Sequence, residues 1–306
     1  MMPKDHVIAV HVRVPATSAN LGPGFDCLGL ALDWWNETEI ALEGHDIQVE
    51  IRGEGAEILP RGPENLIAAA VLRFFELAGA SAPHGLRIRC NNTIPLGSGL
   101  GSSAAAVVTG LLGANRLLGD RFSMAQLLDT ATELEGHPDN AAPALLGGLT
   151  VAAKLPGGVI TRRFDVPALA LAVGVPKFSL STHDARGALP AQVAMSDAVF
   201  NLSCSTLLVE ALCSGDLDLL AQVMDDRLHQ PYRLPLIPGA QAARRAALDA
   251  GAAGCCLSGA GPSLLAIARS DPRPIAEAMA AAFRAFGLEA RAFTPAISSI
   301  GAQISG

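Results

Sequence analysis

The chain has 306 residues, which is enough for one large domain or two of modest size. Its residues are 50% hydrophobic but only 4% aromatic, which predicts an aliphatic, alanine-rich core. The net charge of −7 and the lack of a run of basic residues argue against nucleic-acid binding, and no apolar stretch is long enough to cross a membrane.

The first half of the chain predicts strands and helices in alternation. Met1–His6 lacks the apolar centre of a secretory signal, so we expect a cytoplasmic protein. Alternating apolar residues predict a strand over Val7–Val14 and a hairpin near Glu37–Ile51. The other elements expected here are helices at Leu66–Ala78, Ser103–Leu118 and Met124–Glu135, and strands at Leu86–Ile94 and Leu149–Ala153.

A proline- and glycine-rich stretch, Pro156–Pro167, predicts a boundary between two domains, residues 1–160 and 161–306. Beyond it we expect strands at Leu169–Val175, Cys255–Leu257, Leu264–Ala268 and Leu288–Phe293, and helices at Ala191–Cys213, Ala240–Ala250 and Pro274–Phe286. Because strands and helices do not follow a regular βαβ repeat, the predicted class is α+β with two sandwich-like halves. The six cysteines lie in apolar segments without C-x-x-C spacing, which is typical of buried free thiols in a reducing compartment.

A loop rich in glycine and serine joins a predicted strand to a predicted helix. It reads Pro95, Leu96, Gly97, Ser98, Gly99, Leu100, Gly101, Ser102, Ser103, Ala104, Ala105. Glycines let the backbone approach an anion closely, and the first turn of a helix offers unpaired N–H groups and the positive end of its dipole. The loop therefore predicts a phosphate cradle, with a tight turn that binds no ligand as the alternative.

This loop differs from two common nucleotide-binding patterns. A Walker loop has a lysine after its last glycine, where this chain has Ser102. The third glycine also comes one residue too early for the dinucleotide fingerprint.

Two more loops accompany it, Pro15–Asp26 (PATSANLGPGFD) and Leu257–Ser263 (LSGAGPS). In this order, and spread over nearly the whole chain, the three segments resemble those of the GHMP small-molecule kinases. The resemblance implies an S5-like N-terminal domain, a ferredoxin-like C-terminal domain, and ATP with Mg²⁺ as cofactors. It also implies a homodimer.

The turn after the third helix carries three polar side chains, His137, Asp139 and Asn140. It resembles the H-x-D-N segment of the family members that phosphorylate homoserine, which implies that His137 and Asn140 position the acceptor. Asp139 is the nearby candidate for a general base. The lysine that mevalonate-type relatives pair with their aspartate is missing from Val14–Asp26, so catalysis by orientation and charge stabilisation is the alternative.

The nucleotide side of the site has its own candidates. Magnesium keeps most of its waters and takes one or two protein oxygens, for which Ser98, Ser102 and Glu135 are available. The family's metal glutamate lies shortly before the H-x-D-N segment, so Glu135 matches best; Glu133, or two solvated glutamates without a metal, stay open. The resemblance assigns Asn65 to the adenine, and a helix N-cap is its other role.

The expected acceptor is an amino acid. Its carboxylate calls for arginine, and Arg186 and Arg233 lie in segments resembling the S-T-x-x-A-R and P-x-R patterns of the same relatives. Its ammonium calls for a carboxylate, which Asp26 supplies, and Asn20 and Thr182 complete the polar lining. The resemblance therefore implies transfer of a phosphoryl group from ATP to L-homoserine, a reaction of threonine biosynthesis, in the cytoplasm.

Three other functions remain open from the sequence. Another family member could act on an isoprenoid precursor alcohol, which would have no ammonium for Asp26. A hydrolase could combine Ser102 or Ser103 with His137 and Asp139, although the chain has no G-x-S-x-G elbow. The third is a nucleotide-binding regulator without catalysis.

Overall fold

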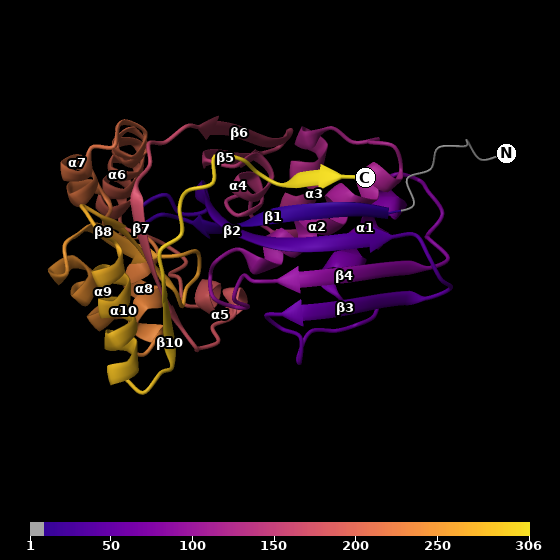
Figure 1. Ribbon diagram of the computed structural model, residues 1–306. Coiled ribbons are helices and arrows are strands. Elements are labelled where there is room, and N and C mark those ends of the chain that lie inside the picture. The colour runs from indigo at the N-terminus through magenta and orange to yellow at the C-terminus, as the bar shows by residue number, and fades with distance from the viewer. Residues whose placement is uncertain (1–8) are drawn as a thin grey trace.

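The structure is a computed structural model that describes residues 9–306. It contains two β-sheets, one of seven strands and one of four, and each has helices packed against it. Figure 1 shows the two sheets next to each other along the long dimension of the molecule. The predicted α+β class is confirmed, since strands and helices are interspersed and the sheets are mixed or antiparallel.

The larger sheet has the order β11-β1-β2-β4-β3, and the hairpin β5–β6 joins it beside β2. Its strands are β1 (Ala9–Ala19), β2 (Leu28–Ala41), β3 (Ile47–Gly53), β4 (Leu86–Asn92), β5 (Leu149–Leu155), β6 (Gly158–Phe164) and β11 (Gln303–Ser305). The period of two in β1 buries Val10, Val12 and Val14 and leaves Ala9 and His11 exposed. One face of the sheet therefore belongs to the core.

The predicted hairpin near residues 37–51 is wrong. Strand β4 lies between β2 and β3, antiparallel to the first and parallel to the second. A parallel pair needs a crossover connection, which α1 (Leu66–Leu77) provides between β3 and β4. The alternation of apolar residues identified both strands correctly, but it carries no information about which strand pairs with which. The predicted strand over Val7–Val14 begins outside the described residues, and β1 runs on to Ala19.

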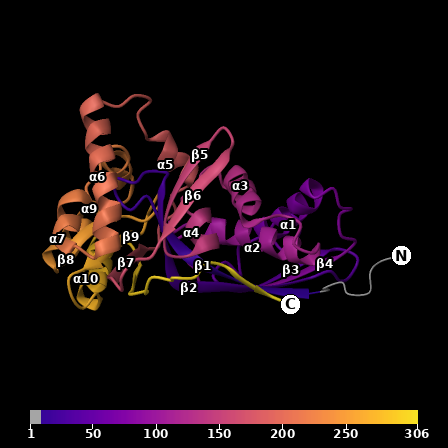
Figure 2. The same ribbon diagram turned by 90° about the horizontal axis from the view of Figure 1, so that it is seen from above.

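One face of the larger sheet is covered by helices, as Figure 2 shows. They are α1, α2 (Ser102–Leu117), α3 (Met124–Glu135) and α4 (Ala141–Leu146). Helices α1 and α2 pack closely because Gly110 has no side chain, and a Cβ there would lie 2.5 Å from the carbonyl oxygen of Ile67. This packing fixes the start of α2 relative to the sheet.

The smaller sheet has the order β10-β7-β9-β8. Its strands are β7 (Ala170–Pro176), β8 (Ala252–Leu257), β9 (Leu264–Ala268) and β10 (Ala290–Phe293). The helices of this half are α5 (Thr182–Gly187), α6 (Met195–Ser214), α7 (Leu217–Val223), α8 (Gln230–Arg233), α9 (Ala240–Asp249) and α10 (Arg273–Ala285), with a 3-10 turn at Leu234–Leu236. The short helices α5, α7 and α8 have too few turns for a periodic pattern, and the sequence did not predict them.

The expected boundary between residues 160 and 161 falls inside β6, which pairs with β5 along its whole length. Pro156 and Gly157, part of the stretch interpreted as a domain boundary, form the turn of this hairpin. The first sheet therefore extends to Phe164. The end of the chain also returns to it, since β11 pairs with β1 and is drawn in yellow beside it in Figure 1.

The core is aliphatic, as the composition predicts, and all six cysteines are free. Burial raises the pKa of the Cys255 thiol to about 12, so it carries almost no reactive thiolate at neutral pH. Within residues 9–306, no helix combines the length and apolarity needed to cross a membrane.

Candidate functional site

Three loops that are far apart in the sequence are bonded to one another. The amide nitrogen of the Asn20 side chain donates to the carbonyl oxygen of Gly259 over 2.8 Å. The Ser258 hydroxyl lies 2.7 Å from the carbonyl oxygen of Gly99 and 2.9 Å from the Ser18 hydroxyl. The loops after β1, before α2 and after β8 thus form one surface between the two sheets.

A cavity of about 390 Å³ lies on this surface. Most of the site residues expected from the sequence line it: Asn20, Asp26, Gly97, Ser98, Gly99, Gly101, Ser102, Ser103, Ala104, Glu135, His137, Asp139, Asn140, Thr182, Arg186, Arg233. The structure therefore brings the phosphate loop, the polar turn and the two arginines together. Five predicted residues do not line it: Asn65, Pro95, Leu96, Leu100, Ala105.

The phosphate loop depends on its glycines. Gly97, Gly99 and Gly101 all have positive φ angles, of 59°, 79° and 71°. A Cβ on Gly99 would lie 2.2 Å from the carbonyl oxygen of Ser258, and one on Gly101 would lie 1.9 Å from the Thr17 hydroxyl. Gly101 is also the N-cap of α2 and provides no side-chain hydrogen bond to the helix. The first turn of α2 therefore offers N–H groups to an anion, as a phosphate cradle requires.

Several residues of the loop face the protein interior or bond to neighbouring backbone, and so support its conformation. The Leu100 carbonyl accepts a hydrogen bond from the backbone of Thr17 over 3.1 Å, and Leu100 and Ala105 are both buried. The Ser98 hydroxyl donates to the carbonyl oxygen of Pro95 over 2.7 Å. Ser98 can therefore offer only its lone pairs to a metal.

The acidic residue beside the loop is Glu135, at the end of α3. Its carboxylate accepts a hydrogen bond of 2.7 Å from Ser103, the serine next to the predicted Ser102. Burial raises the pKa of Glu135, against the opposing effects of the Ser103 hydroxyl and His137. Glu133, the alternative, is exposed and does not line the cavity. Glu135 is thus the carboxylate that a cation at the phosphate loop would stabilise.

Within residues 9–306, no group of three or more acidic, histidine or cysteine side chains forms a metal cage. Mg²⁺ in a nucleotide site needs no such cage, since it takes one or two protein oxygens and fills its shell with phosphates and water. The residues present at the loop fit that requirement.

The polar turn after α3 forms a connected set. The Nδ1 atom of His137 lies 2.5 Å from the Asp139 carboxylate, which is almost fully buried. Burial alone would lower the pKa of His137, but the hydrogen bond and negative charge of Asp139 outweigh it, and the net shift is upward. Asn140 accepts a hydrogen bond of 2.8 Å from the Thr17 hydroxyl. The Asn140 amide is therefore fixed in orientation, with its NH₂ group left to donate.

Two arginines and one aspartate, the residues expected to bind an acceptor, line the cavity together. Arg186, on α5, binds Asp26 through two hydrogen bonds of 2.7 Å and 2.9 Å. The sequence predicted that these residues bind opposite ends of an amino acid, and in this structure they bind each other. Arg233 is only 1% exposed, although it was expected in a polar loop. Burial and the positive charge of Arg186 lower the pKa of Arg233, but a guanidinium remains charged in proteins.

Asn65 is the N-cap of α1. Its side-chain oxygen accepts from the backbone of Ile67 and its NH₂ group donates to the Pro60 carbonyl, both over 3.0 Å. It also lines a second cavity of about 360 Å³, together with Leu96, beside the phosphate loop. This cavity has the mostly apolar walls that a planar base requires.

Sequence reasoning missed three side chains that shape the site. Thr17 in β1 binds Asn140 at the start of α4, and only its membership of the PATSAN segment could have suggested it. The ring of Phe25 lies within 6 Å of both arginine guanidinium groups, at 5.7 Å from Arg186 and 5.1 Å from Arg233. The ring of His229 stacks on that of Phe25, with the two ring centroids 5.1 Å apart.

Comparison with known proteins gives one consistent result. The sequence model of the GHMP kinases N terminal domain matches residues 65–148, and that of the GHMP kinases C terminal matches residues 208–285. The chain is 48% identical to a homoserine kinase of Moorella thermoacetica, over 91% of this chain and 94% of that one. It is 47% identical to a homoserine kinase of a Synechococcus strain, over 96% and 97% of the two chains. The crystal structure of homoserine kinase from Cytophaga hutchinsonii superposes over 100% of both chains with a TM-score of 0.86 and 34% identity.

Proposed function

We propose that this chain, which belongs to the GHMP kinase family, transfers the γ-phosphoryl group of ATP to the hydroxyl of L-homoserine. The product is O-phospho-L-homoserine, an intermediate of threonine biosynthesis. The observation that carries the proposal is one cavity in which the phosphate loop faces Asp26, Arg186 and Arg233. A kinase for an amino acid needs such an arrangement, with a phosphate site at one end and both signs of charge at the other.

The nucleotide half of the proposal uses the loop and α2. The triphosphate would bind the N–H groups of Gly97–Ser103 and the first turn of α2. The adenine would enter the neighbouring apolar cavity that Asn65 lines. Glu135, with Ser98 or Ser102, would hold Mg²⁺, which when bound offsets the charge of the phosphates. Because burial raises the pKa of Glu135, a bound cation would stabilise its ionised form.

The acceptor half of the proposal uses an exchange of partners. The ammonium of L-homoserine would bind Asp26 and its carboxylate would bind Arg186 and Arg233, so that each charge of the existing ion pair gains a new partner. Asn20 and Thr182 line the same cavity and would add polar contacts. A zwitterion suits this site because an acceptor with a single charge would leave one member of the pair uncompensated.

The hydroxyl of the acceptor would be oriented by His137 and Asn140. Thr17 fixes the Asn140 amide, and Asp139 fixes the ring of His137 and favours its protonated form. With its carboxylate engaged by His137, Asp139 acts chiefly through the orientation and charge of that ring. Catalysis would then rest on placing the hydroxyl in line with the γ-phosphorus and on stabilising the developing charge.

The test is ADP release with Mg²⁺-ATP and L-homoserine, with the phosphorylated product identified by ³¹P NMR. Glu135→Ala should lower the turnover number at least about a hundredfold, since it removes the carboxylate proposed for the metal. The exposed neighbour supplies the matched control, Glu133→Ala, which should keep the activity. Turnover that is unchanged in Glu135→Ala would contradict the proposed metal site.

We also propose a homodimer formed through α6, in a cytoplasmic protein. The outer face of α6 carries Met195, Val199 and Leu202, which are 79%, 53% and 67% exposed and recur at helical spacing. Sedimentation should give twice the mass of the chain, and Leu202→Glu should give monomers. A wild-type monomer would contradict the dimer.

The free thiols support the proposed cytoplasmic location, because they are typical of a reducing compartment.

A further inference from the structure

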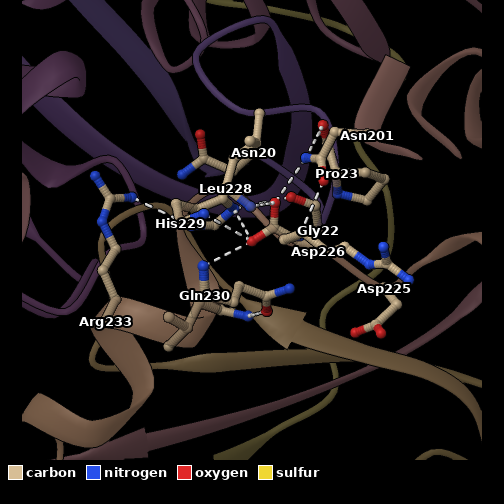
Figure 3. A network of polar contacts seen from close by, with 12 residues as sticks. Asn20, Gly22, Pro23, Asn201, Asp225, Asp226, Leu228, His229, Gln230 and Arg233 are labelled. Carbon is tan, nitrogen blue, oxygen red and sulfur yellow. Dashed lines mark hydrogen bonds and ion pairs between the residues drawn. The ribbon is translucent and has the colours of Figure 1, made fainter. Parts of the chain in front are cut away.

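His229 is a buried histidine between the Asn20–Asp26 loop and α8, and the proposed reaction gives it no role. Its side chain is 0% exposed. The Nε2 atom lies 2.8 Å from the carbonyl oxygen of Gly22, and the Nδ1 atom lies 3.4 Å from a terminal nitrogen of Arg233. Figure 3 shows this imidazole between the two groups, with the Asp226 turn beside it.

These contacts define one protonation state of the ring. A carbonyl oxygen only accepts hydrogen bonds and a guanidinium only donates them. Nε2 therefore carries the proton and donates to Gly22, and Nδ1 is the acceptor for Arg233. Burial lowers the pKa of His229 and outweighs the opposing charge of Asp226, in agreement with this neutral form.

Asp226 is fully used in holding the turn that presents His229. Its carboxylate accepts hydrogen bonds from three consecutive backbone N–H groups at distances of 3.0, 3.0 and 2.6 Å, those of Leu228, His229 and Gln230. Asn201 on α6 donates to the same carboxylate over 2.7 Å and to the carbonyl oxygen of Pro23 over 3.2 Å. The start of α8 and the Asn20–Asp26 loop are thus tied to one frame, and the His229 ring spans the space between them.

Arg233 is left with free donors on the side of the cavity. A guanidinium has five N–H donors, and in the described part of the chain two are engaged, by the Ala185 carbonyl and by His229. Three remain for a ligand, and Arg233 lines the cavity. The Phe25 ring, stacked on His229, lies against the same guanidinium with 5.1 Å between the ring centre and the carbon Cζ. Rotation of the Arg233 guanidinium would break its contact with His229.

We propose that His229 is a positioning residue for Arg233: its Nδ1 lone pair and its stacked ring hold the guanidinium so that the remaining N–H groups face the carboxylate of the acceptor. This inference rests on the proposed function, because it assumes that the acceptor carries a carboxylate. It predicts that substitution of His229 lowers kcat/KM more for an acceptor with a carboxylate than for one without it. A purely structural role of His229 predicts the same loss for both acceptors.

The test compares two acceptors, L-homoserine and L-homoserine amide, which share the hydroxyl and the ammonium but differ in the carboxylate. His229→Gln keeps an NH₂ donor at the position of Nε2 for Gly22, and its amide oxygen, bonded to the same carbon, does not occupy the position of Nδ1. We expect kcat/KM for L-homoserine to fall at least about tenfold, mainly through KM. The value for the amide should change less than about threefold, and KM for ATP should stay the same. His45→Gln, in an exposed loop of the other sheet, is the matched control.

Two further variants keep the test decisive if His229→Gln folds poorly. His229→Asn keeps an acceptor near the position of Nδ1 and should recover part of the preference for the carboxylate. In the Arg233→Gln variant, substitution of His229 should lower kcat/KM for L-homoserine by a further factor of less than about three.

Equal losses for both acceptors in an active, folded variant, or additive losses with Arg233→Gln, would overturn the role of His229 and leave the proposed function intact. A wild-type protein that turns over ATP with some other alcohol and ignores L-homoserine would overturn the proposed function, and this inference with it.

Discussion

At the scale of single residues, four side chains that line the cavity form two pairs of opposite character. Asp26 and Arg186 form a two-bond ion pair, and His137 and Asp139 form a second one. A ligand that separates Asp26 from Arg186 must offer each of them a group of the opposite charge. The charges of Asp26 and Arg186 therefore favour an acceptor that carries both an ammonium and a carboxylate.

Asp26→Asn tests the partner proposed for the ammonium. Hydrogen bonds to a charged group contribute about 1.5–3 kcal/mol, so KM for L-homoserine should rise roughly ten- to a hundredfold. KM for ATP should stay the same, because the phosphate loop is not touched. Steady-state kinetics with each substrate varied in turn provide the measurement. An unchanged KM for L-homoserine would show that the ammonium binds elsewhere.

The His137–Asp139 pair predicts a pH dependence of stability. The pKa of His137 is raised above its ordinary 6.5 in the folded protein, so the folded state holds this proton more tightly than the unfolded state does. The stabilisation is therefore fully present below the unfolded pKa and is lost as the pH rises through the folded pKa. The difference in unfolding free energy between wild type and His137→Gln should be largest at acidic pH and shrink at alkaline pH. Urea unfolding at several pH values measures it, and a constant difference would contradict the pairing.

The sequence identified single residues well wherever they stand in glycine-rich or charged motifs. Asp26, Arg186 and the polar turn all line the cavity as expected. Sequence reasoning missed Thr17, Phe25 and His229 because a threonine in a strand, a half-buried aromatic ring or a lone histidine has no local signal of function. Thr17 and Phe25 contribute through contacts with residues more than a hundred positions away, Asn140 and Arg186.

At the scale of elements, the strand–loop–helix unit from β4 to α2 determines where the phosphate site lies. Its helix, its strand and its glycines were all predicted, because each has a strong local pattern. The pairing of β3 with β4 was not, since α1 brings together strands that are separated by more than thirty residues. Local patterns identify a strand and its buried face, and tertiary packing selects its neighbour.

Gly99→Ala tests the close approach within this unit. Both Gly99 and Gly119 have positive φ angles, of 79° and 82°, but only at Gly99 would a Cβ meet another atom, the Ser258 carbonyl at 2.2 Å. A left-handed alanine costs about 1–2 kcal/mol in either position. Gly99→Ala should in addition shift the loop and raise KM for ATP at least about tenfold. The matched control, Gly119→Ala, should lose stability alone; a normal KM for ATP in Gly99→Ala would contradict the account of the loop.

At the scale of the whole molecule, the candidate cavity lies where the two sheets meet and is lined by loops from both. Asn20 joins the first sheet to the loop after β8, and Ser258 joins that loop back to the phosphate loop. The two family-model matches, residues 65–148 and 208–285, lie one in each half. Because neither half holds the complete set of side chains, the proposed phosphate site and the proposed acceptor site depend on the same junction.

Ser258→Ala tests the strength of this junction. The residue is fully buried, and its loss leaves the Gly99 carbonyl and the Ser18 hydroxyl with one partner fewer. We expect the free energy of unfolding to fall by about 1–3 kcal/mol, measured by urea denaturation. Ser203→Ala removes a comparable hydroxyl-to-carbonyl bond on the exposed face of α6, and it should change stability by less than about 0.5 kcal/mol. Equal effects of the two substitutions would contradict a junction held by Ser258.

The central claim is that the cavity selects a zwitterionic hydroxy acid as its phosphoryl acceptor. The most direct measurement is kcat/KM for ADP release with Mg²⁺-ATP across L-homoserine, L-serine, L-threonine, mevalonate and 4-diphosphocytidyl-2C-methylerythritol. The account predicts that L-homoserine is preferred over both isoprenoid alcohols by at least about a hundredfold, since neither provides an ammonium for Asp26. Turnover with an isoprenoid alcohol and none with L-homoserine would contradict it.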